Sequence, residues 1–178
     1  MLLSAIVLPA VFLSNHHTRK DIGPLLVITY EILAINYGIT NSIKSIVNRN
    51  RPYVYNAELS YEERTDAQSR YSFFSGHTSG AASFSFRFAK VINDYHPNMS
   101  TGAKIGLWSF AALVPADNRL SAGWEARKHY PTDVISGYVI GASIGLLVPH
   151  LHKKRNANFS IYPTRLFNQQ AVSFKWNF

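Results

Sequence analysis

The chain has 178 residues, enough for one domain with a sizeable core, and it contains no cysteine. This composition excludes a disulfide framework, a thiolate metal site and a cysteine nucleophile. The formal net charge of +8 favours an anionic partner, namely nucleic acid, an anionic membrane surface or a phosphorylated substrate. No run of lysine and arginine resembles a nucleic-acid-binding arm. We therefore predict no nucleic-acid partner.

The first half of the chain predicts two helices and a long connection. Residues 1–14 are apolar and form the first helix, although they lack the basic start and cleavage site of a secretory signal. Residues 21–48 form a long second helix, which ends before Pro52 because the residue preceding a proline avoids the α region. Residues 53–73 are polar and rich in tyrosine. A connection of this length is functional or mobile, so we expect a lid or rim.

Three more helices are predicted over residues 77–94, 101–118 and 131–152. Pro131 suits the first turn of the last one. In that helix Gly137, Gly141 and Gly145 recur every four residues. They form a smooth stripe, which lets a neighbouring helix approach closely.

The tail changes character, because apolar and polar residues alternate in residues 172–178. This alternation indicates a strand, which we pair with residues 159–162. The predicted fold class is all-α, a helical bundle of about five to six helices with a small C-terminal β-hairpin. We expect a helical domain over residues 1–156, with the hairpin of residues 157–178 packed on the same domain.

Two stretches approach the length that a bilayer requires. Residues 22–43 carry only Glu31 as a charge, and residues 134–151 carry no Asp, Glu, Lys or Arg. Buried helices of a soluble all-α protein look similar, and the mean hydropathy of -0.06 is low for a protein wholly buried in lipid. The basic cluster Lys153-Lys154-Arg155, directly after the second stretch, fits a juxtamembrane position. We favour a membrane association.

Three short segments carry the residue types of an anion site. Lys44 and Arg51 are seven residues apart, so on one helix they share a face, and two cations there can hold a dianion. In the second segment, Ser75-Gly76-His77, the free amides of a helix start favour an anion. Taken singly, the first segment also fits a solvated basic helix end, and Ser75 fits an ordinary N-cap.

The third segment contains His129 and Asp133, with Asp133 in the first turn of the last helix. Its carboxylate can reach back to His129 and decide which ring nitrogen carries the proton. The other nitrogen then faces the site as a nucleophile or base. The alternative is an ordinary first-turn acid beside a surface histidine.

Taken together, Lys-x6-Arg-Pro from Lys44, then Phe74-Ser75-Gly76-His77, then His129-x3-Asp133 resemble the type 2 phosphatidic acid phosphatase superfamily. That superfamily includes lipid phosphate phosphatases, bacterial acid phosphatases and vanadium haloperoxidases. The resemblance covers roughly residues 20–152. The core of that superfamily commonly has six helices, whereas this sequence predicts five.

The resemblance implies a role for each site residue. His129 would attack phosphorus and form a phosphohistidine, with Asp133 orienting it. His77 would protonate the leaving oxygen and then activate water. The phosphate oxygens would be held by Lys44, Arg51, Ser75 and the Gly76 backbone N–H. No metal or other cofactor is implied.

Two positions depart from the family pattern. Phe74 stands where proline is usual, a mild change in the approach to the turn. The arginine expected six residues before His129 is replaced by Gly123. Arg119 and Arg127 each lie four residues from that position, and we choose Arg119 as the replacement phosphate ligand. If neither reaches the phosphate, activity falls by about 10²–10³-fold, as on loss of one oxyanion donor.

We therefore predict a metal-independent phosphatase that hydrolyses a phosphomonoester or pyrophosphate of a lipid, or a small phosphate ester. We place it at a membrane surface of the bacterial cell envelope with the active site facing the periplasm, the alternative being a soluble periplasmic protein. A vanadate-dependent haloperoxidase is the rival enzyme, although the chain is small for one. A catalytically impaired family member that binds phospholipid is the other rival, because Gly123 replaces the arginine.

Overall fold

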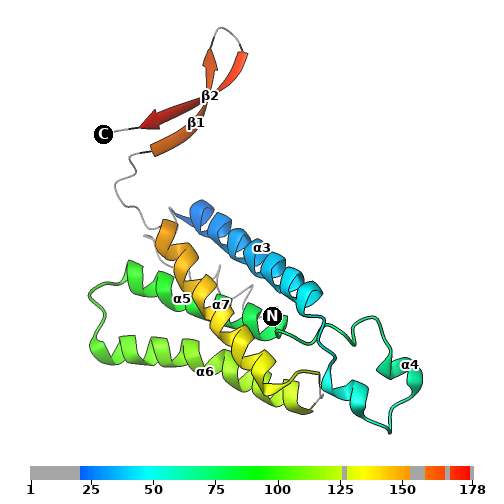
Figure 1. Cartoon of the computed structure of the whole chain (residues 1–178). Helices are drawn as coiled ribbons and strands as arrows, with labels where there is room; N and C mark the ends of the chain where they lie inside the picture. Colours follow the sequence, from blue (N-terminus) through cyan, green and yellow to red (C-terminus); the bar gives the residue numbers. More distant parts are fainter. Residues whose placement is uncertain (1–20, 126–127, 153–158, 167–168, 177–178) are drawn as a thin grey trace.

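A computed structural model describes residues 21–125, 128–152, 159–166 and 169–176 of the chain. The helix predicted over residues 1–14 lies outside these residues. The described helical part consists of four long helices and two short ones, which confirms the all-α class (Figure 1). They are α3 (Ile22–Val47), η1 (Pro52–Tyr55), α4 (Tyr61–Arg64), α5 (Gly76–Tyr95), α6 (Thr101–Glu125) and α7 (Pro131–His152).

The tail contains the strands β1 (Phe159–Leu166) and β2 (Gln169–Trp176), which run antiparallel with Phe159 opposite Trp176. The helices confirm the predicted helical bundle. The C-terminal hairpin as a fold element, its packing on the helices and the division at residue 156 stay predictions.

The helices α5 and α7 approach each other closely along the predicted glycine stripe. A Cβ atom added at Gly137, Gly141 or Gly145 would lie 2.5, 2.1 or 2.3 Å from a backbone oxygen of α5 or its N-cap. These oxygens belong to Ser75, Ser79 and Ser83, which also recur every four residues. A real Cβ does not come this close to an oxygen, so the stripe can hold only glycine. The stripe therefore fixes how α7 lies against the start of α5.

Helix α3 crosses this pair and contacts it through apolar and polar residues. Ile32 is fully buried and packs with Ile144 and Val148 of α7. On the α5 side, Asn36 Nδ2 donates to Ser83 Oγ at 3.1 Å, and Thr40 Oγ1 donates to Asn36 Oδ1 at 3.2 Å. Buried polar groups need such partners. The first bond joins α3 to α5, and the second, within α3, holds the Asn36 amide in place.

Helix α6 completes the helical layer by contacting both members of the close pair. Ser85 Oγ donates to the carbonyl of Ala111 at 2.8 Å, and Tyr138 Oη donates to the carbonyl of Ala112 at 3.0 Å. The helix runs to Glu125 and passes through Pro115, whereas the sequence predicted an end near residue 118. That prediction was wrong by about two turns.

Helix α3 ends at Val47 because Asn48 adopts the left-handed conformation, with φ 46° and ψ 46°. Asparagine tolerates this conformation better than most residues, and its N–H closes the helix on the carbonyl of Lys44. Arg51 therefore lies beyond the helix, as the N-cap of η1. The expectation that Lys44 and Arg51 share one helix face was wrong.

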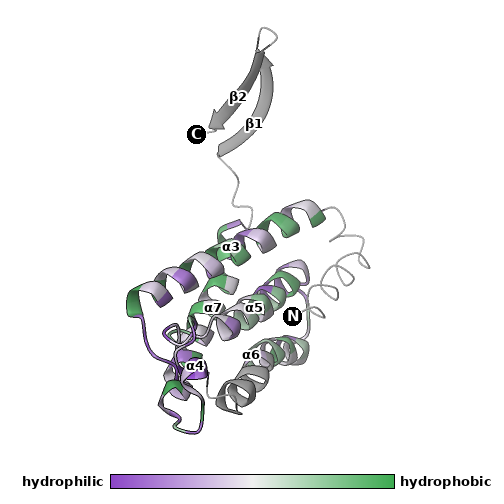
Figure 2. Ribbon diagram, turned by 90° about the vertical axis from the view of Figure 1, so that its right-hand side faces the viewer, coloured by the Kyte–Doolittle hydropathy of each residue, from purple (hydrophilic) through white to green (hydrophobic). Residues whose placement is uncertain are grey.

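The connection between α3 and α5 is more ordered than the predicted loop. It contains η1 and α4, and α4 begins with a capping box in which Ser60 and Glu63 bond each other's backbone N–H. Figure 2 shows hydrophilic residues concentrated in this connection, beside the ends of the more apolar helices. By length and composition, two helical segments within the described residues could cross a membrane, Ile22–Tyr55 and Pro131–His152.

The glycine stripe makes a testable prediction. We expect Gly141→Ala to lower the free energy of unfolding by about 2 kcal/mol, because the new methyl group forces the two backbones apart. Gly106→Ala in α6 is the matched control, since nothing lies within 4 Å of its added Cβ. Alanine favours a helix by up to about 1 kcal/mol over glycine, so this control should be neutral or stabilising. Urea unfolding measures both, and equal stability of the two variants would contradict the stripe.

Candidate active site

The three predicted segments meet at one end of the bundle, where α3 ends and α5 and α7 begin (Figure 1). Backbone hydrogen bonds join them. Ser72 N–H donates to the carbonyl of Arg49 at 3.0 Å, and Ser75 N–H donates to the carbonyl of Asp133 at 3.0 Å. A third bond, from Arg51 N–H to the carbonyl of Ser69 at 2.7 Å, closes the connection on itself. The site is thus assembled from segment ends that are far apart in the sequence.

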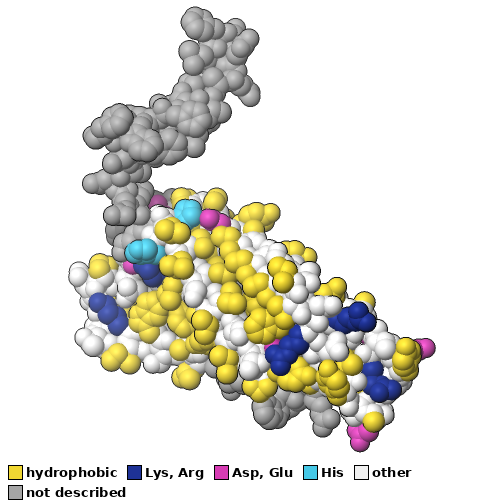
Figure 3. All heavy atoms as spheres, in the orientation of Figure 1, with side chains coloured by type: hydrophobic (Ala, Val, Ile, Leu, Met, Phe, Trp, Pro, Cys, Tyr) yellow, Lys and Arg dark blue, Asp and Glu magenta, His cyan; other side chains and the backbone are white. Residues whose placement is uncertain are grey.

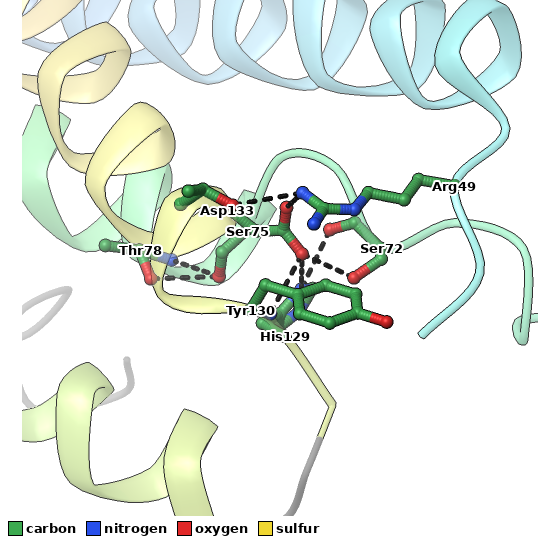
Figure 4. A network of polar contacts seen from close by, with 8 residues as sticks. Arg49, Ser72, Ser75, Thr78, His129, Tyr130 and Asp133 are labelled. Atoms are coloured by element: carbon green, nitrogen blue, oxygen red, sulfur yellow. Dashed lines mark hydrogen bonds and ion pairs between the residues drawn. The ribbon is translucent and has the colours of Figure 1, made fainter. Parts of the chain in front are cut away.

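Asp133 is the centre of the polar network, and its side chain has no exposed surface (Figure 4). Oδ1 accepts from Arg49 Nη1 at 2.8 Å, while Oδ2 accepts from Ser72 Oγ at 2.5 Å and from Tyr130 N–H at 3.0 Å. Burial raises the pKa of this carboxyl, but the adjacent His129, the two hydrogen bonds to Oδ2 and the charge of Arg49 outweigh it. The pKa of Asp133 is therefore lowered, and the group stays ionised at neutral pH.

Arg49 reaches across the site to the first turn of α7, as Figure 4 shows. Besides Asp133, its Nη1 donates to Thr132 Oγ1 at 3.0 Å, and its guanidinium carbon lies 4.0 Å from the ring centroid of Tyr130. The sequence reasoning missed Arg49 and Ser72. Arg49 stands within the Lys44–Arg51 segment, so a third cation there was a usable signal; Ser72 had none.

His129 is held by a different group from the one expected. Its Nδ1 lies 2.8 Å from the carbonyl oxygen of Ser72, but 3.9 Å from Asp133 Oδ2, which is too long for a hydrogen bond. A carbonyl oxygen can only accept, so Nδ1 carries the proton. In the neutral ring Nε2 is then unprotonated. The Ser72 backbone, and not the Asp133 carboxylate as predicted, therefore decides which ring nitrogen carries the proton.

Lys44 and Arg51 do not share a helix face, but their charges interact. Burial and then the charge of Arg51 lower the pKa of Lys44, and Asp133 acts in the opposite direction. Two cations that repel each other gain from an anion bound between them. Arg51 Nε is also buried, with no hydrogen-bond partner among the described residues. This pair is therefore suited to hold an anionic group.

Ser75 caps α5, which is the ordinary role considered for it above. Its Oγ accepts from Thr78 N–H at 3.4 Å and from Thr78 Oγ1 at 2.9 Å. Because both bonds use the oxygen as acceptor, the hydroxyl proton of Ser75 is left to donate elsewhere. At Gly76 an added Cβ would lie 2.8 Å from Thr40 Cγ2, so glycine fits here with little spare room. Its N–H belongs to the first helical turn and has no acceptor within the helix.

The remaining predicted residues are placed less completely. His77 is exposed in the first turn of α5. Gly123 and Arg119 both lie in α6, one turn apart, but the side chain of Arg119 and all of Arg127 lie outside the described part of the chain. Which arginine replaces the one absent at Gly123 stays a prediction. Within the described residues, no group of three His, Asp or Glu side chains is arranged to hold a metal ion.

Phe74, the other departure from the expected pattern, is fully buried. The Cβ that Gly137 lacks would lie 3.4 Å from its ring, so the aromatic side chain packs at the contact between α5 and α7.

Comparison with known families agrees with this geometry. A family model described as PAP2 superfamily matches residues 25–157, which include every described site residue. Searches of curated proteins and of solved structures gave no match.

The cation pair makes a testable prediction about anion binding. We expect inorganic phosphate to raise the thermal unfolding midpoint of the protein, because a ligand of the folded state stabilises it. Lys44→Met and Arg51→Met should each weaken phosphate binding by about 10–100-fold, the value of one charge-assisted hydrogen bond. Arg70→Met is the control, since Arg70 is exposed in the same connection. Equal phosphate affinity in all four proteins would rule out this site.

Proposed function

The chain belongs to the PAP2 superfamily, whose members are generally phosphatases, and from this premise we propose that it hydrolyses a lipid phosphate or pyrophosphate through a phosphohistidine intermediate. The observation that carries the mechanism is the 2.8 Å contact of His129 Nδ1 with the Ser72 carbonyl. It leaves the lone pair of Nε2 free to attack. The histidine side chain is only 9% exposed, so few waters compete for it.

In the first step, Nε2 of His129 attacks phosphorus and the bond from phosphorus to the leaving oxygen breaks. The product is a phosphohistidine whose Nδ1–H still donates to the Ser72 carbonyl. As the ring gains positive charge, that hydrogen bond becomes stronger. Asp133, whose Oδ2 lies 3.9 Å from Nδ1, adds a buried negative charge that also favours the cationic ring.

His77 supplies the proton that the leaving oxygen takes up. In the second step it removes a proton from water, whose oxygen attacks the phosphohistidine and releases inorganic phosphate and neutral His129. Lys44 and Arg51 neutralise the phosphate oxygens, helped by the Ser75 hydroxyl and the Gly76 amide at the start of α5. Arg119 is our choice for the further cation in place of the arginine absent at Gly123.

The position of the site supports a lipid substrate. Lys44 is in the last turn of α3 and Asp133 in the first turn of α7, so the apolar stretches of residues 22–43 and 134–151 extend away from the site together. Figure 3 shows hydrophobic side chains over the face made by these two helices. The exposed apolar side chains of α3 include Leu26, Val27, Tyr30, Leu33 and Tyr37, and those of α7 include Ile135, Val139, Leu147 and Leu151.

A stretch of about 20 helical residues matches the hydrocarbon core of a bilayer. Glu31, the one charged side chain in the first stretch, lies 3.2 Å from His152 of α7 and is thus paired with a polar group. A phosphate bound at the site would lie at the membrane surface, and its alkyl chains would follow the apolar face. A bacterial envelope and a periplasmic active site stay predictions from the sequence.

The mechanism predicts that His129→Ala lowers hydrolysis of p-nitrophenyl phosphate by about 10⁴-fold or more, as for loss of a nucleophile. His77→Ala should cost about 10²–10⁴-fold, the usual share of a general acid. His150→Ala is the matched control, because His150 is exposed near the far end of α7. Acid-labile ³²P-labelled enzyme should form in the wild type and be absent from His129→Ala. Equal activity of His129→Ala and wild type would refute the mechanism.

The membrane assignment predicts that the protein floats with vesicles of phosphatidylcholine and phosphatidylglycerol in a density gradient. A double variant, Leu26→Glu with Tyr37→Glu, should reduce the bound fraction at least about tenfold, because each charge in lipid costs about 2.5–3.5 kcal/mol. Ile105→Glu on α6, which is not one of the two candidate spans, is the control. Circular dichroism checks that each variant is helical. A wild type that stays at the bottom of the gradient would contradict the assignment.

A further inference from the structure

We propose that Arg49 is a positioning residue, which holds the nucleophile His129 in place through Asp133 and Ser72 without binding the phosphate itself. The proposal rests on the phosphatase function proposed above. In the sequence Arg49 lies between Lys44 and Arg51, the two proposed phosphate ligands, but its side chain contacts Asp133, Thr132 and Tyr130.

Three residues form a closed ring of hydrogen bonds. Arg49 Nη1 donates to Asp133 Oδ1 at 2.8 Å, and Ser72 Oγ donates to Asp133 Oδ2 at 2.5 Å. Ser72 N–H donates in turn to the backbone carbonyl of Arg49 at 3.0 Å. Each member is bonded to the other two, so none can move without disturbing both.

These hydrogen bonds determine the position of the nucleophile, because the carbonyl that binds His129 Nδ1 belongs to Ser72. A shift of Ser72 therefore shifts the imidazole. Arg49 also holds the chain that carries His129, since it contacts Thr132 and the ring of Tyr130. Arg49 thus acts both on the group that binds the imidazole and on the segment that carries it.

The contacts of Arg49 separate its role from that of Arg51. Its Nη1 donates to Asp133 and Thr132, its guanidinium lies over the ring of Tyr130, and its charge is balanced by a fully buried carboxylate. Arg51 instead has a buried Nε without a hydrogen-bond partner among the described residues, and it repels Lys44. The Arg49 side chain is 38% exposed, so a phosphate could also reach it directly. The experiment below distinguishes direct phosphate binding from positioning of His129.

The charged groups around Asp133 predict a specific effect on pH dependence. Arg49 follows α3, Lys44 lies on α3 and is electrostatically coupled to Asp133, and His129 lies on the loop before α7. The charge of Arg49 helps to lower the pKa of Asp133. Removing that charge raises the pKa of Asp133, so Asp133 becomes protonated at higher pH, and the neutral carboxyl group accepts more weakly from Ser72 Oγ and Tyr130 N–H. The acidic limb of kcat/KM should then move to higher pH.

The experiment compares Arg49→Met, Arg49→Lys and Arg70→Met with the wild type, using p-nitrophenyl phosphate. Arg49→Met should lower kcat by about 10–100-fold, as a small displacement of a reacting group does. Its KM and the inhibition constant of inorganic phosphate should change by less than about threefold. Arg49→Lys keeps the charge, so its acidic limb should stay near that of the wild type while kcat lies in between. Arg70→Met, an exposed arginine of the same connection, should resemble the wild type.

A double-mutant cycle with Asp133→Asn tests whether Arg49 acts through Asp133. If it does, Arg49→Met should cost much less kcat in the Asp133→Asn background than in the wild type. Because Arg49→Met leaves the buried Asp133 charge unpaired and can unfold the protein, the cycle also provides a folded comparison in which that charge is absent.

An inactive wild type would refute the proposed function and, with it, this inference, which rests on that function. With an active wild type, three results would overturn the inference. They are an Arg49→Met variant that matches Arg70→Met, a phosphate inhibition constant that rises at least tenfold with Arg49→Met, and additive kcat losses in the cycle.

Discussion

A fully buried carboxylate has to be surrounded by donors, and the site depends on how this chain meets that requirement at Asp133. Leaving such a charge without partners would cost several kcal/mol, so its donors cannot be removed freely. They come from three separate segments, namely Arg49 after α3, Ser72 before α5 and the backbone of Tyr130 before α7. The electrostatic requirement of one side chain thus brings the three segments of the site together. His129, the proposed nucleophile, is held by this arrangement as a consequence.

The packing of α5 on α7 also connects the segments of the site. Ser75 is at once the N-cap of α5, the first of the three serines that face the glycine stripe, and the donor of a backbone bond to Asp133. The close packing of α5 on α7 and the position of the proposed phosphate-binding segment are therefore determined together. A change that slides α7 along α5 by one turn would move Asp133 away from Ser75. The geometry of the candidate site and the packing of these two helices therefore cannot vary independently.

Much of this could be predicted from the sequence, because the governing signals are local. Apolar length and Pro131 indicated the long helices, and the four-residue spacing of glycines indicated a close helix contact. What failed depended on contacts between distant residues. Helix α3 ends within one residue of the predicted end, at the left-handed Asn48, so Arg51 lies outside it and cannot share its face with Lys44. Nothing in the local sequence shows that the connection folds back to pair Ser72 with Arg49. The spacing of His129 and Asp133 suggested a direct bond for the same reason, since it could not show that a backbone carbonyl takes Nδ1.

The two backbone bonds at the base of the connection have a consequence for how the protein can change. Arg51 N–H to Ser69 and Ser72 N–H to Arg49 hold the two ends of the connection together. The intervening residues form a closed loop on the surface, and lengthening such a loop is inexpensive in entropy, about 0.6 kcal/mol for each doubling. Residues can be inserted around η1 and α4 while the two ends stay fixed. This connection is therefore the place where residues beside the candidate site can be added or replaced without changing the contacts of Asp133.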